Sequence, residues 1–346
     1  MGLQIGELVP KKEITIEQLR TKLIAIDAHN IIYQFLSNIR QQDGTPLMDN
    51  KGKITSHLSG LFYRSIKMLT QGIKPVYVFD GTPPELKKAT RELRAQRKQL
   101  AQEKYEEAKK QGSQEDMLKY SKQTVRITEE IVDESKKLLK AMGIPIIEAP
   151  SEGEAQAAQL AKHEAFSVIS QDYDSLLFGA PRVIQNLTFS RKKRLATGMW
   201  VSSSIELIEL DKVLNSLQIN HDQLICLGIL SGTDFNPGGV KGIGPKKGLE
   251  LIRRYKEPVL IFEAVEKQLK DIEQEMPFDW KEIFELFKKP NVIKEYEIKF
   301  KDIDKDKIKE ILVKEHDFSE ERIENTLEKL KEFNEEKQQK GLSDYF

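Results

Sequence analysis

Three acidic residues each come shortly after an apolar run. Asp27 follows LIAI at 23–26, Asp80 follows VYVF at 76–79, and Asp172 lies just beyond FSVI at 166–169. Each run has the length of a buried strand, and helical patterns separate them, which predicts an α/β fold with a mostly parallel sheet flanked by helices. Ligands of such sheets bind outside the carboxyl ends of the strands. We therefore expect these three carboxylates to converge.

Four more acids join them in our hypothesis, and each also has an ordinary structural explanation. Glu152 and Glu154 open an expected helix, where Ser151 with Glu154 matches a capping box. Asp174 lies in a loop, and Asp234 suits an Asx turn. Seven carboxylates at one sheet edge would repel each other unless cations neutralised them. Mg²⁺ and Mn²⁺ prefer such ligands, and two ions about 4 Å apart can clamp both oxygens of a phosphodiester displacement.

A basic stripe begins shortly after Asp80. Lys87, Arg91, Arg94 and Lys98 are spaced by four, three and four, so they share one helical face, with Arg97 nearby. Such stripes are often only solvated surface, but beside a metal pair they can hold a phosphate. The surrounding residues 83–134 are rich in charge and poor in aliphatic side chains. We expect exposed helices there, broken near 112–113, standing off the body.

Overall composition excludes some classes of protein and leaves others open. The 346 residues include 55 basic and 55 acidic side chains, so net charge alone does not indicate a nucleic-acid partner. Cys226 is the only cysteine, which excludes a disulfide within the chain and favours a reducing compartment. The sequence has no apolar run of the roughly 18 residues that a membrane span needs, and its start lacks a signal-peptide core. We expect a soluble, intracellular protein.

Six segments together resemble the flap endonucleases, which belong to the XPG-type structure-specific 5′ nucleases. They are AIDAHNIIYQFL (25–36), GIKPVYVFDGTPPELK (72–87), APSEGEAQAA (149–158), SQDYDSLLFG (170–179), LSGTDFNPG (230–238) and KGIGPKK (241–247). The resemblance spans essentially the whole chain, and all seven acids fall on the family's metal-binding positions. It implies two Mg²⁺ ions, for which Mn²⁺ can substitute. The family assigns Asp27, Asp80, Glu152 and Glu154 mainly to one ion, and Asp172, Asp174 and Asp234 mainly to the other.

The same resemblance implies an activity and a set of DNA contacts. The expected reaction is cleavage of DNA near the junction of a 5′ flap with duplex, with accompanying 5′–3′ exonuclease activity, in Okazaki fragment maturation and base excision repair. Lys87 and Arg94 would hold the scissile phosphate, and Tyr33 would stack on a base. A helix–two-turn–helix near 228–255 would hold duplex DNA and can bind K⁺. The further DNA contacts that we expect are Gly2, Arg40, Arg64, Arg91, Arg97, Lys98, Gly242, Gly244, Lys246 and Lys247.

We expect one nuclease domain over residues 1–330. Its parts are an N-terminal section (1–82), a helical gateway and cap insertion (83–134), an internal section (135–255) and C-terminal helices (256–330). Residues 331–346 read as a flexible tail. Its ending places Gln339, Leu342, Tyr345 and Phe346 in the spacing Q-x-x-L-x-x-Y-F, which resembles the box that docks replication proteins on a PCNA-type sliding clamp. Two terminal aromatics in a polar tail suit burial by such a partner.

Alternatives remain open at this stage. Asp172 and Asp174 after a strand also resemble haloacid-dehalogenase phosphatases, in which the first Asp is a nucleophile. A catalytically silent junction-binding or clamp-adaptor protein is a second alternative. The run RKKR at 191–194 is expected to be a hairpin turn without an assigned role. The chain is expected to be a monomer, located in the cytoplasm at the nucleoid if archaeal or in the nucleus if eukaryotic. No basic extension follows the docking box, which favours an archaeal origin.

Overall fold

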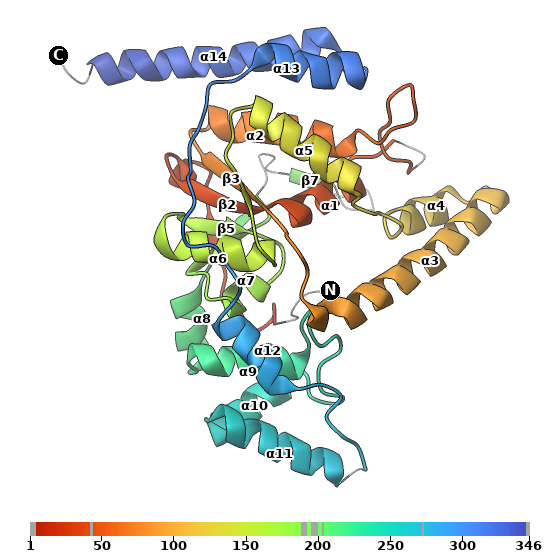
Figure 1. Ribbon diagram of the computed structural model, residues 1–346, viewed down its shortest axis with the longest axis vertical. Coiled ribbons are helices and arrows are strands. Elements are labelled where there is room, and N and C mark those ends of the chain that lie inside the picture. The colour runs from red at the N-terminus through yellow and green to blue at the C-terminus, as the bar shows by residue number, and fades with distance from the viewer. Residues whose placement is uncertain are drawn as a thin grey trace.

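The computed structural model describes residues 5–41, 44–187, 192–194, 200–202, 204–271 and 273–343 (Figure 1). Within these ranges, seven strands form a sheet in the order β1-β9-β6-β5-β2-β3-β4. The central strands β6, β5, β2, β3 and β4 pair in parallel, whereas β9 runs antiparallel to β6 and β1. The expected mostly parallel sheet is therefore confirmed. Its strands are β1 (Lys12–Ile14), β2 (Leu23–Asp27), β3 (Lys74–Phe79), β4 (Ile146–Glu148), β5 (Ser167–Ile169), β6 (Arg182–Gln185) and β9 (Ile205–Glu209).

Strand β2 shows how the sheet is buried on both faces. Ile24 and Ile26 pack into one hydrophobic cluster, while Ala25 between them packs into the other, because successive side chains of a strand point to opposite faces. The Ile24 face is covered by α1, α2, α5 and the C-terminal helices, which Figure 1 shows as an upper layer. These helices are α1 (Ala28–Asn38), α2 (Ser56–Thr70), α5 (Glu129–Ala141), α13 (Lys305–Lys309), the π-helix η3 (Glu310–Glu315) and α14 (Glu320–Ser343).

The opposite face carries the helices of the internal section. Phe178, Phe235 and Phe287 form an aromatic cluster there, with ring centroids 4.8–6.5 Å apart. Helices α9 and α10 pack together across the segment 232–244, within which the helix–two-turn–helix expected near 228–255 stays a prediction. The helices on this side are α6 (Gly153–His163), α7 (Asp174–Leu177), α8 (Leu210–Leu217), α9 (His221–Ser231), α10 (Pro245–Tyr255), α11 (Pro258–Lys270) and α12 (Trp280–Lys288).

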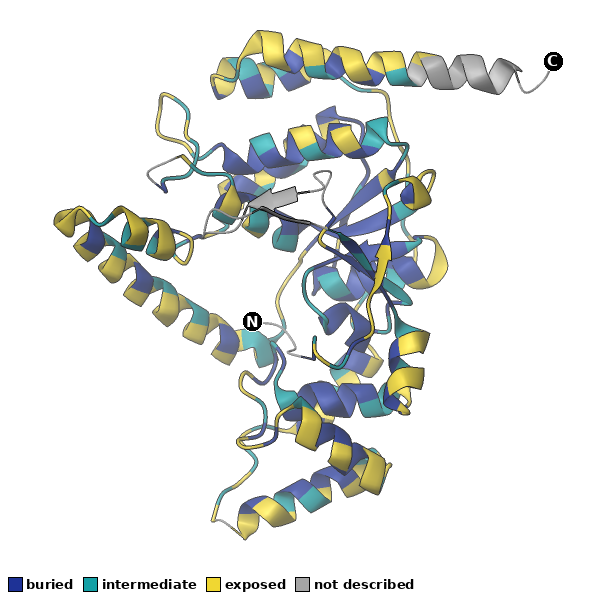
Figure 2. Cartoon of the chain, turned by 180° about the vertical axis from the view of Figure 1, so that it is seen from behind, coloured by how far each residue is buried: buried dark blue, intermediate teal, exposed yellow. Residues whose placement is uncertain are grey.

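A helical arm stands off the body, as the charged composition of this region indicates. Helix α3 (Lys88–Gln111), after the short 3₁₀ turn η2 (Glu85–Lys87), projects outward, and α4 (Gln114–Ser121) returns along it (Figure 2). Gly112 ends α3 with φ of 69°, a left-handed conformation that glycine adopts without strain. The predicted break at 112–113 is confirmed. The arm is shorter than expected, since α5 begins at Glu129 and packs on α2.

Helix α14 continues to Ser343, and Leu330 and Phe333 pack against the core, whereas the flexibility expected of residues 331–346 stays a prediction. Two local expectations are wrong. Lys192–Arg194 form strand β7, paired with β8 (Trp200–Ser202), whereas we had placed a hairpin turn at 191–194. Glu152, and not Ser151, is the N-cap of α6, and no side-chain cap bond forms, so the capping-box explanation of Glu154 fails. A further short 3₁₀ turn, η1 (Glu17–Leu19), precedes β2.

Candidate active site at the carboxyl edge of the sheet

The strand ends and helix starts place the acids along one edge of the sheet. Asp27 is the last residue of β2 and caps α1, accepting the Asn30 backbone N–H at 3.0 Å. Asp80 directly follows β3, and Glu152 precedes α6. Because β2 and β3 are parallel neighbours, their ends meet, and the electrostatic influence of Asp80 on Asp27 reflects this proximity.

Glu154 lies at the centre of the group. Its Oε1 accepts the hydroxyl protons of Ser170 at 3.0 Å and Ser175 at 2.8 Å, so the carboxylate points into the body and not along its own helix. Asp172 follows β5, and its Oδ2 accepts an N–H of the Asn30 side-chain amide at 3.0 Å. Asp174 opens α7 and is buried at 4% exposure.

Both carboxylate oxygens of Asp80 have close polar neighbours. Oδ1 accepts the Gly153 backbone N–H at 2.6 Å, and Oδ2 lies 3.2 Å from Nδ1 of His29. A Cβ on residue 153 would lie 2.6 Å from that Oδ1, which explains why glycine opens α6 at this point. This contact joins the end of β3 to the start of α6.

Two cations of the basic stripe reach the acids. Lys87 Nζ forms an ion pair with Glu152 and lies 3.6 Å from Asp234 Oδ2. Arg94 Nη2 contacts both oxygens of Asp234 at 2.6 and 2.8 Å. The turn at 233–236 is made by Thr233 and Asn236, which leaves the carboxylate of Asp234 facing Arg94. The expectation of an Asx turn at Asp234 is therefore wrong.

Burial and mutual repulsion shift the pKa values of several acids upward. Burial and the neighbouring Asp80 raise the pKa of Asp27 to about 8. Burial, with Asp174, Asp172 and Asp27, raises the pKa of Glu154 well above its usual range. Burial and Asp234 raise the pKa of Asp172. The charged forms of these carboxylates are disfavoured by burial and by each other, so a cation bound among them would be strongly stabilised.

The donor chemistry fits divalent metal ions, although the side chains do not form a closed cage. No three His, Cys, Asp or Glu side chains within the described ranges converge closely enough to hold an ion as they stand. Glu152 and Asp234 are turned toward Lys87 and Arg94. Oxygen donors with raised pKa values nevertheless match the preference of Mg²⁺ and Mn²⁺ for carboxylates and water. Assignment of the seven acids as metal ligands stays a prediction.

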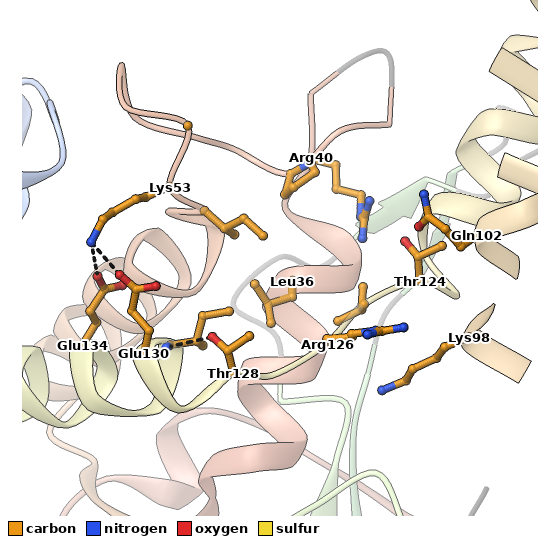
Figure 3. Close-up of a pocket in the computed structure, with 15 residues that line it drawn as sticks. Leu36, Arg40, Lys53, Lys98, Gln102, Thr124, Arg126, Thr128, Glu130 and Glu134 are labelled. Atoms are coloured by element: carbon orange, nitrogen blue, oxygen red, sulfur yellow. Dashed lines mark hydrogen bonds and ion pairs between the residues drawn. The ribbon is translucent and has the colours of Figure 1, made fainter. Parts of the chain in front are cut away.

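A separate cavity of about 670 Å³ lies between the arm, the 40–54 segment and the start of α5 (Figure 3). Arg40, Lys98 and Arg126 line it, so two predicted DNA contacts meet here with a third cation. Burial and the charges of Arg126 and Arg94 lower the pKa of Lys98. Arg40 donates to the backbone carbonyls of Ser37 and Gly44, which fixes its position beside the opening.

The remaining predicted DNA contacts fall into three groups. Tyr33 is 40% exposed on α1, and Arg91, Arg97, Gly242, Gly244, Lys246 and Lys247 are also exposed. Arg64 is different, since its guanidinium donates to the Leu187 carbonyl and packs over the Phe35 ring. The expectations for Gly2, Tyr345 and Phe346 lie outside the described residues, as do those for the side chains of Gln339 and Leu342.

Sequence reasoning missed His29, Asn30 and Arg126. The first two occupy the first turn of α1, where their side chains meet Asp80 and Asp172. Their position two and three residues after Asp27 was a usable signal, because the first turn of a helix after a strand end faces the same edge. Arg126 gave no such signal, since the irregular segment between α4 and α5 decides where it lies.

Comparisons with known proteins agree with this arrangement. The family model described as the XPG N-terminal domain matches residues 4–101, and the XPG I-region matches residues 143–234. The chain is 51% identical over 310 residues to flap endonuclease 1 of Pyrococcus horikoshii, covering 89% of this chain and 88% of that protein. The structure of flap endonuclease-1 from Methanococcus jannaschii matches with a TM-score of 0.76 and 42% identity, covering 97% of this chain and all of that one. The catalytic core of Rad2, solved in complex with a DNA substrate, matches with a TM-score of 0.69 and 25% identity over 94% of this chain and 97% of that chain. No described helix is both long and apolar enough to cross a membrane.

Proposed function

Since the chain belongs to the flap endonuclease family and is a structure-specific 5′ flap endonuclease, we propose that it cuts by two-metal catalysis at the carboxyl edge of its sheet. Asp27, Asp80, Glu152 and Glu154 would hold mainly one Mg²⁺, and Asp172, Asp174 and Asp234 mainly the other. Bound divalent ions generate hydroxide from water and neutralise the charge that grows on the leaving oxygen. Mn²⁺ would substitute for Mg²⁺.

The gathering of these acids at one edge of the sheet is the observation that carries the proposal. Asp27, Asp172 and Asp174 all act on Glu154, and Asp234 acts on Asp172, although these residues come from separate strand ends and loops. A core without bound ligands has little reason to gather so many carboxylates, because each lowers the stability of its neighbours. Bound divalent cations would replace the repulsion between the carboxylates by attraction to the metal.

The chain's own cations would handle the DNA. Lys87 and Arg94 lie against the acids and would hold the scissile phosphate, whose non-bridging oxygens gain charge in the transition state. The cavity beside the arm presents Arg40 and Lys98 to the single-stranded flap. Tyr33, 40% exposed, would stack on a base.

The element α9–α10 would anchor the duplex. Gly244 caps α10 and Pro245 starts it, so the backbone N–H groups of the mostly exposed segment 241–247 can approach a DNA phosphate. Lys246 and Lys247 are exposed on the first turn of α10 and add charge. The same turns would bind K⁺.

The decisive experiment compares the wild type with Asp174→Ala on 5′-flap, 3′-flap and plain duplex DNA, with and without Mg²⁺. We expect Mg²⁺-dependent cutting of the 5′ flap alone, abolished in the variant. Asp211→Ala is the matched control, since it removes an exposed acid at the start of α8. Equal activity of the Asp174 variant and wild type would refute the assignment of the site.

We also propose that the end of α14 presents a docking box for a PCNA-type sliding clamp, with Gln339, Leu342, Tyr345 and Phe346 as anchors. An aromatic and aliphatic plug of this spacing suits a hydrophobic pocket on a partner. Deleting 341–346 should abolish stimulation by the clamp and leave basal cutting intact. Loss of basal cutting would mean that the segment acts in the nuclease itself. Such a protein would work on the chromosome, as a monomer when unbound.

The alternative readings are not supported. The family match covers both halves of the nuclease and leaves no support for a haloacid-dehalogenase phosphatase with Asp172 as nucleophile. A silent adaptor would not need Asp27 and Asp174 buried beside Glu154, because these carboxylates disfavour each other's charged forms.

A further inference from the structure

His29 is the one imidazole that touches a predicted metal ligand among the described residues. Its Nδ1 lies 3.2 Å from Asp80 Oδ2, and its ring meets Phe79 edge-on, with centroids 6.0 Å apart and planes at 79°. The side chain is 26% exposed, so it belongs neither to the core nor to the free surface. The catalytic scheme proposed above gives it no role.

The same nitrogen has two neighbours, and only one can be its hydrogen-bond partner in a given tautomer. The Asp80 backbone N–H also lies 3.2 Å from Nδ1. A protonated Nδ1 donates to the carboxylate, whereas an unprotonated Nδ1 accepts the backbone N–H. The bond to the carboxylate is the stronger, because its acceptor is charged. The backbone N–H can then reach water, since Asp80 is exposed.

We propose that His29 is a positioning residue that fixes the Asp80 carboxylate for metal binding. Asp80 Oδ1 is already held by the Gly153 N–H at 2.6 Å, and Nδ1 of His29, 3.2 Å from Oδ2, would fix the remaining rotation of the carboxylate by donating a hydrogen bond to it. The inference rests on the proposed two-metal function, in which Asp80 is a ligand. Partners that orient ligating groups affect metal affinity by about 10- to 100-fold when they are removed.

This role differs from that of a structural core residue. His29 contacts Phe79 only at the edge of its ring, and the buried neighbours of β3 pack without it. Its removal should therefore change the orientation of one carboxylate and leave the stability of the fold nearly unchanged. His29→Leu keeps the bulk and removes the donor. His29→Asn restores a donor, because its side-chain amide nitrogen falls near the place of the histidine Nδ1.

The test is Mn²⁺ binding to the whole, DNA-free protein at one fixed pH, measured by the loss of the free-ion EPR signal. We expect His29→Leu to weaken binding about 10- to 100-fold, with His29→Asn within a few-fold of wild type. His163→Leu is the matched control, since His163 is an exposed histidine at the end of α6. Thermal unfolding of each variant checks that the fold persists.

A second readout separates positioning from a general loss of activity. In single-turnover cleavage, His29→Leu should raise the Mg²⁺ concentration needed for half-maximal rate and keep the rate at saturating Mg²⁺ near that of wild type. Equal Mn²⁺ affinity of His29→Leu and wild type would overturn the inference, as would equal weakening in the Leu and Asn variants. Failure of the wild type itself to bind Mn²⁺ would instead overturn the two-metal proposal, and the inference with it.

Discussion

Replacing Lys87 by methionine should separate catalysis from DNA binding. Methionine keeps most of the side chain's volume and removes its charge. Lys87 Nζ pairs with Glu152 and lies 3.6 Å from Asp234, and its side chain is only 16% exposed. Burial alone would lower the pKa of Lys87, but the carboxylates of Glu152 and Asp234 outweigh it and hold the pKa above its ordinary value. The ammonium group is therefore charged when a phosphate arrives.

The magnitude follows from this geometry. Lys87 Nζ and Asp234 Oδ2 are 3.6 Å apart. At that distance and an effective dielectric constant of about 20, the attraction between their charges is about 4–5 kcal/mol before desolvation. A preorganised cation that meets charge developing in the transition state contributes about 10²- to 10³-fold in rate. We expect the single-turnover cleavage rate at saturating Mg²⁺ to fall by that factor. DNA affinity should change only a few-fold, with the salt dependence reduced by about one phosphate contact.

The variant also tests the relation between Lys87 and the acids. Removal of one partner leaves Glu152 buried without its cation, which typically costs about 3–5 kcal/mol. The free energy of unfolding, measured by urea titration, should drop without divalent ions and recover when Mg²⁺ is added. Stopped-flow or quench-flow cleavage gives the rate, and fluorescence anisotropy in Ca²⁺ gives DNA affinity. Equal losses in rate and in DNA affinity would refute a role for Lys87 in catalysis.

Two further predictions concern stability. Burial lowers the pKa of His57, and contacts with His57 and His316 outweigh burial to lower the pKa of Glu134 and of Asp49 respectively. At these three groups the folded state binds fewer protons than the unfolded state, so they lower stability as pH falls below about 6.5 and through the range near 4, whereas the site acids with raised pKa values act in the opposite direction. The contribution of Glu134 is isolated by comparison with Glu134→Gln: the difference in the free energy of unfolding between wild type and variant, monitored by circular dichroism, should shrink as pH falls through the range near 4, and a constant difference would contradict this. Phe287→Ala should cost about 3–5 kcal/mol in urea unfolding, because the ring is 1% exposed within the aromatic cluster. A loss below 1 kcal/mol would show that the cluster repacks.

The strands that the sequence predicts are those whose apolar runs are continuous. β2, β3 and β5 are buried on both faces and lie in the nearly continuous apolar runs LIAI, VYVF and FSVI. β4 (IIE) ends in an acid and β9 (IELIE) contains two, so neither forms such a run. Their strand conformation comes from pairing with β3 and β6, which is information that the local sequence does not carry.

The candidate site was partly predictable for a related physical reason. Acids at strand ends share an edge because parallel strands share a direction, so Asp27 and Asp80 could be placed together in advance. The pairing of Arg94 with Asp234 could not, because it depends on how the arm leaves the body. The continuation of α14 past residue 331 could not be predicted either, because it is marked only by Phe333, which packs against the core.

The arm occupies a connection between neighbouring strands. β3 ends just before it, α5 follows it, and β4 then pairs directly with β3. Both attachment points are thus fixed by the sheet, whatever lies between them. The part of the arm beyond Arg94 can consequently change in length or composition during evolution without moving Lys87 and Arg94 away from the acids that they contact.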